Sequence, residues 1–148
     1  MIYEISQNIL HIIYTDKDIH TDHFSLLEKI ANTYEGSIKN RIGFNFPMNI
    51  VDKSSPIRKY NASYVIVYKK RDISTKKHEL RHAMYFIDTD YKASVLSLWN
   101  SFSVSTQSSI RSMLLKMNYP DDQNIILDEF QAYYFTEKPN FFGKLVYS

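Results

Sequence analysis

Apolar residues in the first half of the chain gather in short runs, separated by one segment with helical periodicity. Residues 8–14 form an apolar run that predicts a buried strand, whereas residues 22–35 repeat apolar positions at helical spacing and predict a helix. Residues 43–51 and 62–70 are expected to be extended, and the latter are rich in β-branched and aromatic residues. Pro47 places the former at a sheet edge or beside a bulge, because proline cannot donate a ladder hydrogen bond.

The second half of the chain carries helical patterns. We expect helices at four places: 74–88, 91–102, 105–117 and 124–137. Ser74 and Thr75 are natural N-cap residues for the first helix, and Pro139 ends the last. Strands followed by helices predict an α+β fold, in which a small twisted sheet has helices packed on one side and a helical C-terminal half follows.

Composition and charge narrow the class of protein. The 148 residues include three Gly, four Pro and no Cys, and they contain no linker or low-complexity segment, which fits one domain spanning residues 1–148. The formal net charge of +2 gives no electrostatic case for nucleic acid as a partner. No run of about 18 apolar residues occurs, and residues 1–7 lack the pattern of a signal peptide, so we expect a soluble, cytoplasmic protein with no membrane partner.

The strongest chemical signal is the pattern H-E-x-x-H at residues 78–82, inside a predicted helix. Residues four apart lie on one face of a helix, so His78 and His82 can direct imidazole nitrogens at one metal ion. Glu79 points about 100° away from them, where it can reach a metal-bound water and act as general base. The alternative is that both histidines are polar residues on a solvated helix face.

Glu129 is the candidate third ligand. It lies near the middle of the predicted helix 124–137, among apolar neighbours. A carboxylate is costly to bury without a partner, so this side chain either faces water or meets a cation such as a metal ion. A catalytic zinc site needs three protein ligands and one open position, and Glu129 would complete the set begun by the two histidines.

These residues resemble the gluzincin-type zinc metallopeptidases, in which H-E-x-x-H is followed by a helix that supplies a glutamate; the small, single-domain minigluzincins are nearest in size. The resemblance implies a zincin-like fold with Zn²⁺ as cofactor. It implies His78, His82 and Glu129 as the zinc ligands. Glu79 would be the general base of an endopeptidase whose substrate is a peptide or protein. The stretch 129–133 is also similar to a Glu-Phe-x-Ala-Tyr pattern of small bacterial zincin-like domains.

The chain departs from the gluzincin pattern at two places. Many gluzincins carry an aspartate four residues after the ligand glutamate, where it orients a zinc histidine, and Tyr133 stands there in this chain. Residues 43–49 are the nearest counterpart of the Gly-x-Met-Glu-Asn loop of related aminopeptidases, and they lack its glutamate, which argues against that branch. The long stretch between His82 and Glu129 leaves room for an inserted helical hairpin.

Two tyrosines are candidates for stabilising the oxyanion of a tetrahedral intermediate. Tyr85 lies three residues after His82, and Tyr133 lies one helical turn after the third candidate ligand. For Tyr133 two other roles are open: its hydroxyl would orient a metal ligand, or its ring would simply pack.

The strand predicted at residues 62–70 has two interpretations. The resemblance to gluzincins implies that it borders the cleft and binds an extended peptide as an added strand; otherwise it is an ordinary strand of the sheet. In the first case the basic residues 69–71 at its end would favour acidic groups on one side of the scissile bond.

Functions outside this enzyme class stay open at this point. The main alternative is a non-catalytic zincin-fold module that binds a partner protein, although an intact Glu79 favours the enzyme because a structural metal site needs no base. A third interpretation is a toxin or effector protease aimed at one host protein. His20 and His23, with Asp18 and Asp22 nearby, would bind a second metal, or they simply lie at a helix start where Asp is a capping residue.

Overall fold

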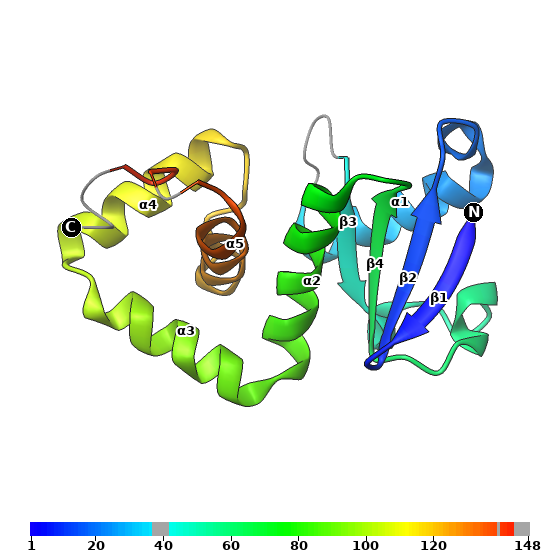
Figure 1. The fold of residues 1–148 in the computed structure, drawn as a ribbon, viewed down its shortest axis with the longest axis horizontal. Helices are drawn as coiled ribbons and strands as arrows, with labels where there is room; N and C mark the ends of the chain where they lie inside the picture. Colours follow the sequence, from blue (N-terminus) through cyan, green and yellow to red (C-terminus); the bar gives the residue numbers. More distant parts are fainter. Residues whose placement is uncertain (37–41, 139, 144–148) are drawn as a thin grey trace.

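The computed structural model describes residues 1–36, 42–138 and 140–143, and it shows a sheet followed by a helical half (Figure 1). The strands are β1 (Ile2–Ser6), β2 (Ile9–Tyr14), β3 (Phe44–Pro47) and β4 (Tyr64–Lys69). The helices are α1 (Asp22–Glu35), α2 (Ile73–Ile87), α3 (Thr89–Ser101), α4 (Val104–Lys116) and α5 (Gln123–Thr136). Three short 3-10 turns are η1 (Asp18–His20), η2 (Met48–Ile50) and η3 (Pro56–Lys59). The predicted α+β class is therefore confirmed.

The sheet has the strand order β1-β2-β4-β3, in which β2 and β4 run parallel and the two outer pairings are antiparallel. β4 is thus an interior strand with both of its edges paired. The expectation that residues 62–70 border the cleft and receive a peptide is therefore wrong, because strand addition requires an unpaired edge. The preference for acidic substrate groups expected from residues 69–71 depended on that geometry, so it is no longer supported. Nζ of Lys69 instead forms an ion pair with Oδ1 of Asp16 at 2.7 Å.

β1 is a strand that the apolar pattern did not predict, since four of its five residues are exposed. Gln7 and Asn8 connect it to β2 in a tight turn, with φ angles of 50° and 66°. Two-residue hairpins need positive φ at both positions, which Asn-Gly or Asp-Gly usually provides. The Gln-Asn pair gives no such signal, so the hairpin was missed.

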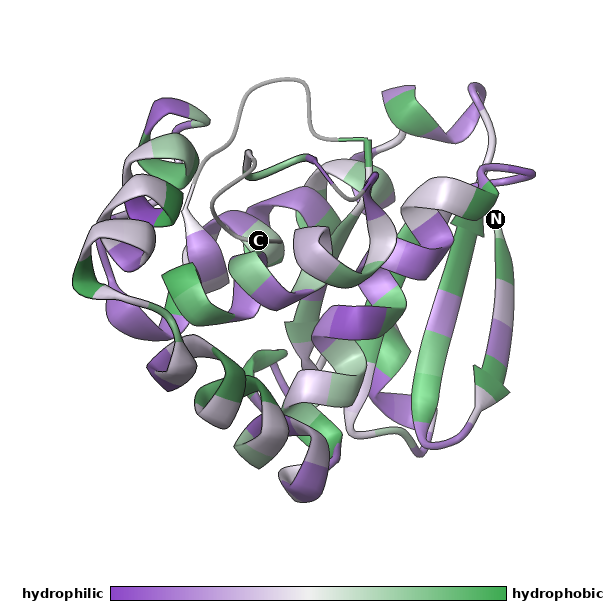
Figure 2. Ribbon diagram, turned by 60° about the vertical axis from the view of Figure 1, so that its left-hand side comes forward, coloured by the Kyte–Doolittle hydropathy of each residue, from purple (hydrophilic) through white to green (hydrophobic). Residues whose placement is uncertain are grey.

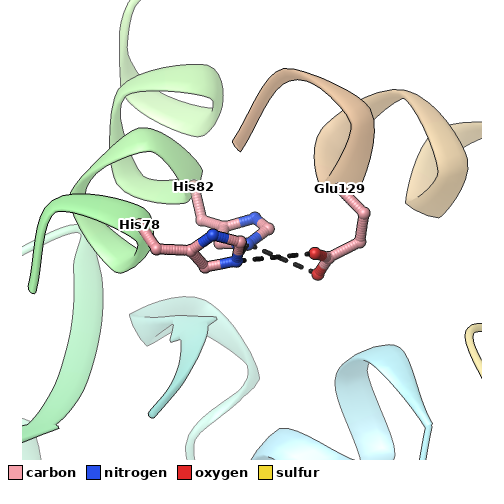
Figure 3. Close-up of side chains that lie close together, drawn as sticks. All are labelled: His78, His82 and Glu129. Carbon is pink, nitrogen blue, oxygen red and sulfur yellow. Dashed lines mark hydrogen bonds and ion pairs between the residues drawn. The ribbon is translucent and has the colours of Figure 1, made fainter. Parts of the chain in front are cut away.

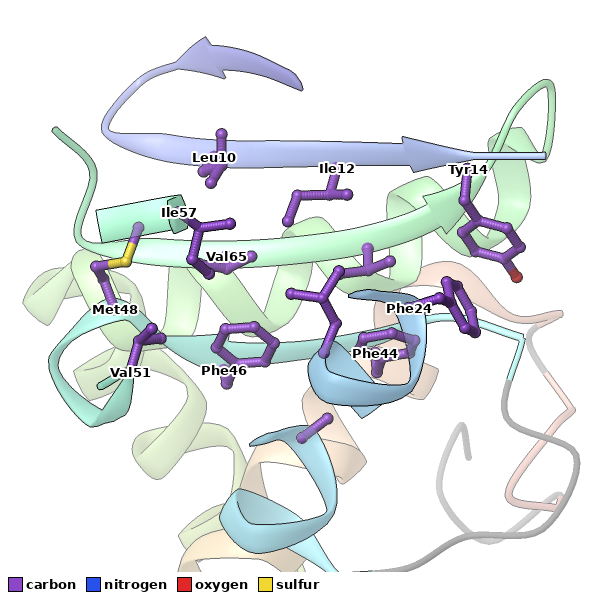
Figure 4. Close-up of a cluster of buried hydrophobic side chains, with 13 residues drawn as sticks. Leu10, Ile12, Tyr14, Phe24, Phe44, Phe46, Met48, Val51, Ile57 and Val65 are labelled. Carbon is purple, nitrogen blue, oxygen red and sulfur yellow. The ribbon is translucent and has the colours of Figure 1, made fainter. Parts of the chain in front are cut away.

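Helices cover both faces of the sheet, where the sequence predicted only one. α1 packs Phe24 and Leu27 against one face, in a core shared with β3 (Figure 4). α2 packs against the other face through Ala83. Successive side chains of β4 point to opposite cores, because side chains alternate along a strand: Val65 lies in the α1 core and Ile66 in the α2 core.

β3 forms one outer edge of the sheet, beside α2. Met48, directly after the strand, continues the antiparallel ladder by donating its N–H to the carbonyl of Ser63 at 2.9 Å. Hydrogen-bonded positions alternate along an antiparallel pair, so the backbone groups of Asn45 and Pro47 point away from β4. Pro47 has no N–H to leave unpaired there, which confirms the predicted edge position. The strand is shorter than predicted because the chain turns into η2 at Met48.

α2 begins at Ile73, one residue before the predicted start. Its N-cap is Asp72, whose side chain accepts a hydrogen bond from the N–H of Thr75 at 3.0 Å. Ser74 and Thr75, the predicted caps, therefore lie in the first turn of the helix. Asp72 follows Arg71, whose φ of 71° turns the chain sharply at the end of β4. This short connection lays α2 directly against the strand that it follows.

The helices α3, α4 and α5 enclose a separate core. Trp99 of α3, Ile110 of α4 and Phe130 of α5 are buried together in it, and α5 also packs against α2. Hydrophilic and hydrophobic residues alternate around these outer helices, whereas β2 is hydrophobic along most of its length (Figure 2). The helices predicted in this half are confirmed to within two residues at each end. Within residues 1–36, 42–138 and 140–143, no helix is both long enough and apolar enough to cross a membrane.

Candidate metal centre

His78 and His82 of α2 meet Glu129 of α5, and we call these three side chains the metal cluster (Figure 3). Their ligand atoms all lie within 4.8 Å of one another. Nε2 of His82 is 3.2 Å from Nε2 of His78 and 3.3 Å from Oε1 of Glu129, and Nε2 of His78 is 3.6 Å from Oε2 of Glu129. Ligand atoms around one tetrahedral zinc ion stand about 3.4 Å apart. The structure thus brings together three predicted side chains that could hold a metal ion.

Burial makes this cluster a poor place for an unpaired charge. His82 and Glu129 are each 1% exposed, and His78 is partly buried. In the described part of the chain, Oε2 of Glu129 is a buried atom with no hydrogen-bond partner. A carboxylate oxygen left without a partner is costly there, and a metal cation would satisfy it. Two imidazoles and a carboxylate also form a donor set that suits zinc.

Charges within the cluster oppose the cost of burial. Burial raises the pKa of the Glu129 carboxyl, but the adjacent His82 and His78 outweigh it and hold that pKa below its ordinary value. Burial lowers the pKa of His82, yet the carboxylates of Asp128 and Glu129 raise it well above its usual range. Without a metal these groups are therefore held together as an ion pair. A bound cation would take the place of the proton between them.

Asp128, one residue before Glu129, orients His82. Its Oδ1 lies 2.9 Å from Nδ1 of His82, on the side of the ring away from the other two ligands. A carboxylate at this position fixes the orientation of a ligating imidazole and directs Nε2 to the metal. The resemblance to gluzincins pointed to position 133 for this role, and the sequence analysis missed Asp128. In the sequence, the role of Asp128 is indicated only by its position directly before the candidate ligand Glu129.

Glu79 lies beside the metal cluster and is 5% exposed. Burial raises the pKa of its carboxyl, and the nearby His82 and His78 partly oppose that shift. Its Oε2 accepts a hydrogen bond from Nδ2 of Asn45 at 2.8 Å, and Oδ1 of Asn45 accepts one from the Tyr64 hydroxyl at 2.5 Å. Asn45, which no sequence motif indicated, therefore holds one oxygen of Glu79. The other oxygen, Oε1, lies near Gly43, which lines the cavity together with Glu79.

A cavity of about 410 Å³ adjoins the cluster. The three ligands, Glu79 and Tyr133 all line it, together with residues from α1 and from the loop before β3. Tyr85 lies elsewhere: it lines a second cavity of about 440 Å³, next to Asp128 and Tyr34. Of the two tyrosines predicted to stabilise an oxyanion, Tyr133 is thus the one beside the ligands. Burial raises the pKa of Tyr85 to about 12.

Tyr133 shares a hydrogen bond with a second tyrosine, Tyr119, which the sequence analysis did not single out. Their hydroxyl oxygens are 2.8 Å apart, and both residues line the cavity. The ring of Tyr133 also packs edge-on against the ring of His78, with centroids 4.5 Å apart. Burial, followed by the charge of Glu129, raises the pKa of Tyr133 to about 12, so its hydroxyl keeps its proton at neutral pH. One hydroxyl of the pair donates to the other, which leaves the O–H of the accepting tyrosine to donate at the cavity wall.

Gly43 is the residue that lets β3 and α2 approach each other at the cavity. A Cβ atom there would stand 2.3 Å from Cγ2 of Thr75 and 3.0 Å from Oε1 of Glu79. We expect Gly43→Ala to lower the free energy of unfolding by about 1–3 kcal/mol, as overpacking does, and to displace Glu79. Denaturant unfolding measures the first effect.

The closest of these contacts can be relieved separately. Thr75→Ser removes Cγ2 but keeps the hydroxyl, which donates to Asp72 at 2.6 Å. The double variant Gly43→Ala, Thr75→Ser should therefore regain much of the lost stability. A single Gly43→Ala variant as stable as the parent would contradict this account of the glycine.

The predicted second metal site near His20 and His23 does not form a cluster. Nε2 of His23 is 2.8 Å from the Tyr3 hydroxyl, and Asp18 accepts a hydrogen bond from the N–H of Thr15 at 2.8 Å. Thr21 provides the N-cap of α1. Among the residues that the structure describes, the metal cluster is the one group of three or more His, Cys, Asp or Glu side chains close enough to share an ion.

The three candidate ligands, the carboxylate that orients His82 and the buried Glu79 are thus all contributed by α2 and α5. Comparison of the chain with protein-family models, with curated proteins and with solved structures gives no match in any of the three. What the protein does must therefore be inferred from the geometry of its own side chains.

Proposed function

We propose that this protein is a zinc-dependent peptide hydrolase of the gluzincin type, acting as an endopeptidase. The observation that carries the proposal is the buried metal cluster, with Glu79 in the wall of the same cavity. A metal that only stabilises a fold is usually enclosed by four protein ligands and needs no base. Three ligands, an adjacent carboxylate and an open cavity instead match the requirements of metal-assisted hydrolysis.

Each group in the cavity has a task in this reaction. Zinc, when bound, supplies a Lewis acid and lowers the pKa of a coordinated water to about 7. Glu79 accepts the proton of the attacking water and later delivers it to the leaving amine. Asn45 holds Oε2 of Glu79, which directs Oε1 toward the water. The pair of Tyr133 and Tyr119 offers one hydroxyl donor, the O–H not used between them, to the negative charge that develops on the substrate carbonyl.

The outer edge of β3 is the place where an extended substrate would lie. The four residues of β3 are buried, so a peptide would meet this edge at Gly43, which is partly exposed and lines the cavity. A peptide added there would form backbone hydrogen bonds that do not depend on its sequence. Such binding suits an endopeptidase, because backbone hydrogen bonds can form to the middle of a substrate chain and require no free terminus.

The test is cleavage of a broad library of internally quenched fluorogenic peptides by the zinc-loaded protein. We expect cleavage within the peptides, its loss on chelation and its return on adding one equivalent of zinc. The metal-free protein serves as the control for contaminating proteases. If the protein binds zinc but cleaves no member of the library, the proposal fails, and a zincin-fold module that binds a partner protein becomes the better account.

A further inference from the structure

A continuous chain of hydrogen bonds leads from α3 to the metal cluster. The hydroxyl of Tyr91 donates to Oε1 of Gln131 at 2.6 Å. Nε2 of Gln131 donates to Oδ1 of Asp128 at 3.0 Å, and the same oxygen lies 2.9 Å from Nδ1 of His82. A residue of the helical insert between the histidines and Glu129 is thus linked to a metal ligand.

Gln131 can adopt only one amide orientation in this chain of bonds. It is fully buried, at 0% exposed. Its NH₂ group donates to Oδ1 of Asp128 and to the backbone carbonyl of Arg81, the latter at 3.2 Å, and its oxygen accepts from Tyr91. The reversed amide would set a carbonyl oxygen against the carboxylate of Asp128 and against the carbonyl of Arg81. The Tyr91 hydroxyl, as the donor to Oε1, therefore supports this single orientation.

The amide orientation in turn fixes the protons on His82. Oδ1 of Asp128 accepts from Gln131, and a carboxylate can only accept hydrogen bonds, from the imidazole as well. Nδ1 of His82 must then carry the hydrogen of the 2.9 Å bond. With a single ring proton on Nδ1, the lone pair of Nε2 faces the other two ligands, which is the form that a metal requires.

Arg81, the residue before His82, holds Tyr91 in place. Its guanidinium lies over the rings of Tyr91 and Phe135, at 5.7 and 5.0 Å from their centroids. Its Nη1 is also 3.4 Å from the Tyr91 hydroxyl, and its backbone carbonyl is one of the acceptors of Gln131. The same residue thus contacts both ends of the Tyr91–Gln131 pair.

We propose that Tyr91 and Gln131 are positioning residues for the metal ligand His82, acting through Asp128, and that α3 thereby sets the affinity of the metal cluster. This inference rests on the proposed zinc site. Gln131 donates to the same oxygen of Asp128 that meets the imidazole, so it adds a second contact that holds this carboxylate in place.

The test measures zinc affinity by competition with a chromophoric chelator, in the full-length protein and two variants. Gln131→Met keeps the size of the side chain and removes its hydrogen bonds. We expect about tenfold weaker zinc binding, which is the low end of the loss seen when a residue that supports a ligating histidine is replaced. Tyr91→Phe keeps the ring and removes one hydroxyl, so a smaller loss is expected. The visible spectrum of the cobalt-substituted protein should change in both, because the geometry at His82 changes.

Tyr68→Phe is the matched control, because it removes a hydroxyl that lies 3.0 Å from Nδ1 of His11 at the sheet, outside the metal cluster. It should lower stability and leave zinc affinity unchanged. Tyr91 reaches Asp128 only through Gln131, so replacing Tyr91 should weaken zinc binding little further once Gln131 has been replaced. The effects of the two substitutions on zinc affinity should therefore be non-additive. A purely structural role would instead change unfolding and leave affinity at the control value.

The outcomes separate the two proposals. If the parent protein binds no zinc, the proposed function itself fails. If the parent binds zinc and both variants bind it as tightly as Tyr68→Phe does, only the positioning role of Tyr91 and Gln131 is overturned. Should Gln131→Met not fold, Tyr91→Phe decides the question, because its ring still fills the same space.

Discussion

Glu79→Gln is expected to lower the rate of peptide cleavage by about 10²- to 10⁴-fold, the usual contribution of a positioned general base. Glutamine has nearly the same size, and its carbonyl oxygen can still accept the hydrogen bond from Asn45. It cannot take a proton from the attacking water. Zinc content and the free energy of unfolding should therefore stay close to the parent values, and they are measured by elemental analysis and denaturant titration alongside the cleavage rate.

Glu4→Gln provides the control for a lost negative charge. Glu4 is exposed on β1, where its residue partner across the sheet is His11, and it does not line the cavity. This variant should cleave at the parent rate. A Glu79→Gln protein that also cleaves at the parent rate would remove Glu79 from the mechanism.

Removal of zinc is expected to lower the melting temperature by roughly 8–16 °C. At free zinc about 1,000-fold above the dissociation constant, binding stabilises the folded state by about 4 kcal/mol, and each kcal/mol shifts the melting temperature of a chain of this size by about 2–4 °C. The physical reason is the buried Glu129, whose Oε2 has no hydrogen-bond partner within the described residues. Thermal unfolding with zinc and with a chelator measures the difference.

Two histidine variants show whether the effect comes from the metal cluster. His82→Ala removes a ligand, so its melting temperature should respond neither to zinc nor to chelator. His20→Ala, in η1 and outside the cluster, should respond as the parent does. Equal melting temperatures for the parent with zinc and with chelator would contradict a zinc site of this affinity.

The sequence was sufficient to predict the three side chains of the metal cluster, because their spacing is local or their environment is unusual. His78 and His82 are one helical turn apart, which any helix brings together. Glu129 is a carboxylate in an apolar helix, and its burial needs a cation. The helices of the second half were also predictable, because Gly and Pro are absent from each of them and turn, cap and proline residues mark the ends of the last.

The supporting residues could not be predicted, because their roles depend on tertiary packing. Asn45 reaches Glu79 only because β3 lies at the sheet edge beside α2, and the strand order is not encoded in any local pattern. Gln131 matters only because Tyr91 and Asp128 flank it in three dimensions. The resemblance to gluzincins suggested that β4 borders the cleft, whereas its β-branched and aromatic residues suit the centre of a sheet, where the structure places it.

The spacing of the metal cluster along the chain also determines the order in which it assembles. The two histidines of α2 come together when one helical segment forms, in about 0.1–1 μs. Glu129 joins them only after α3 and α4 have folded back, which requires closing a long loop and is slower. Zinc present during folding would therefore meet the histidine pair first and hold α2 helical while α5 docks.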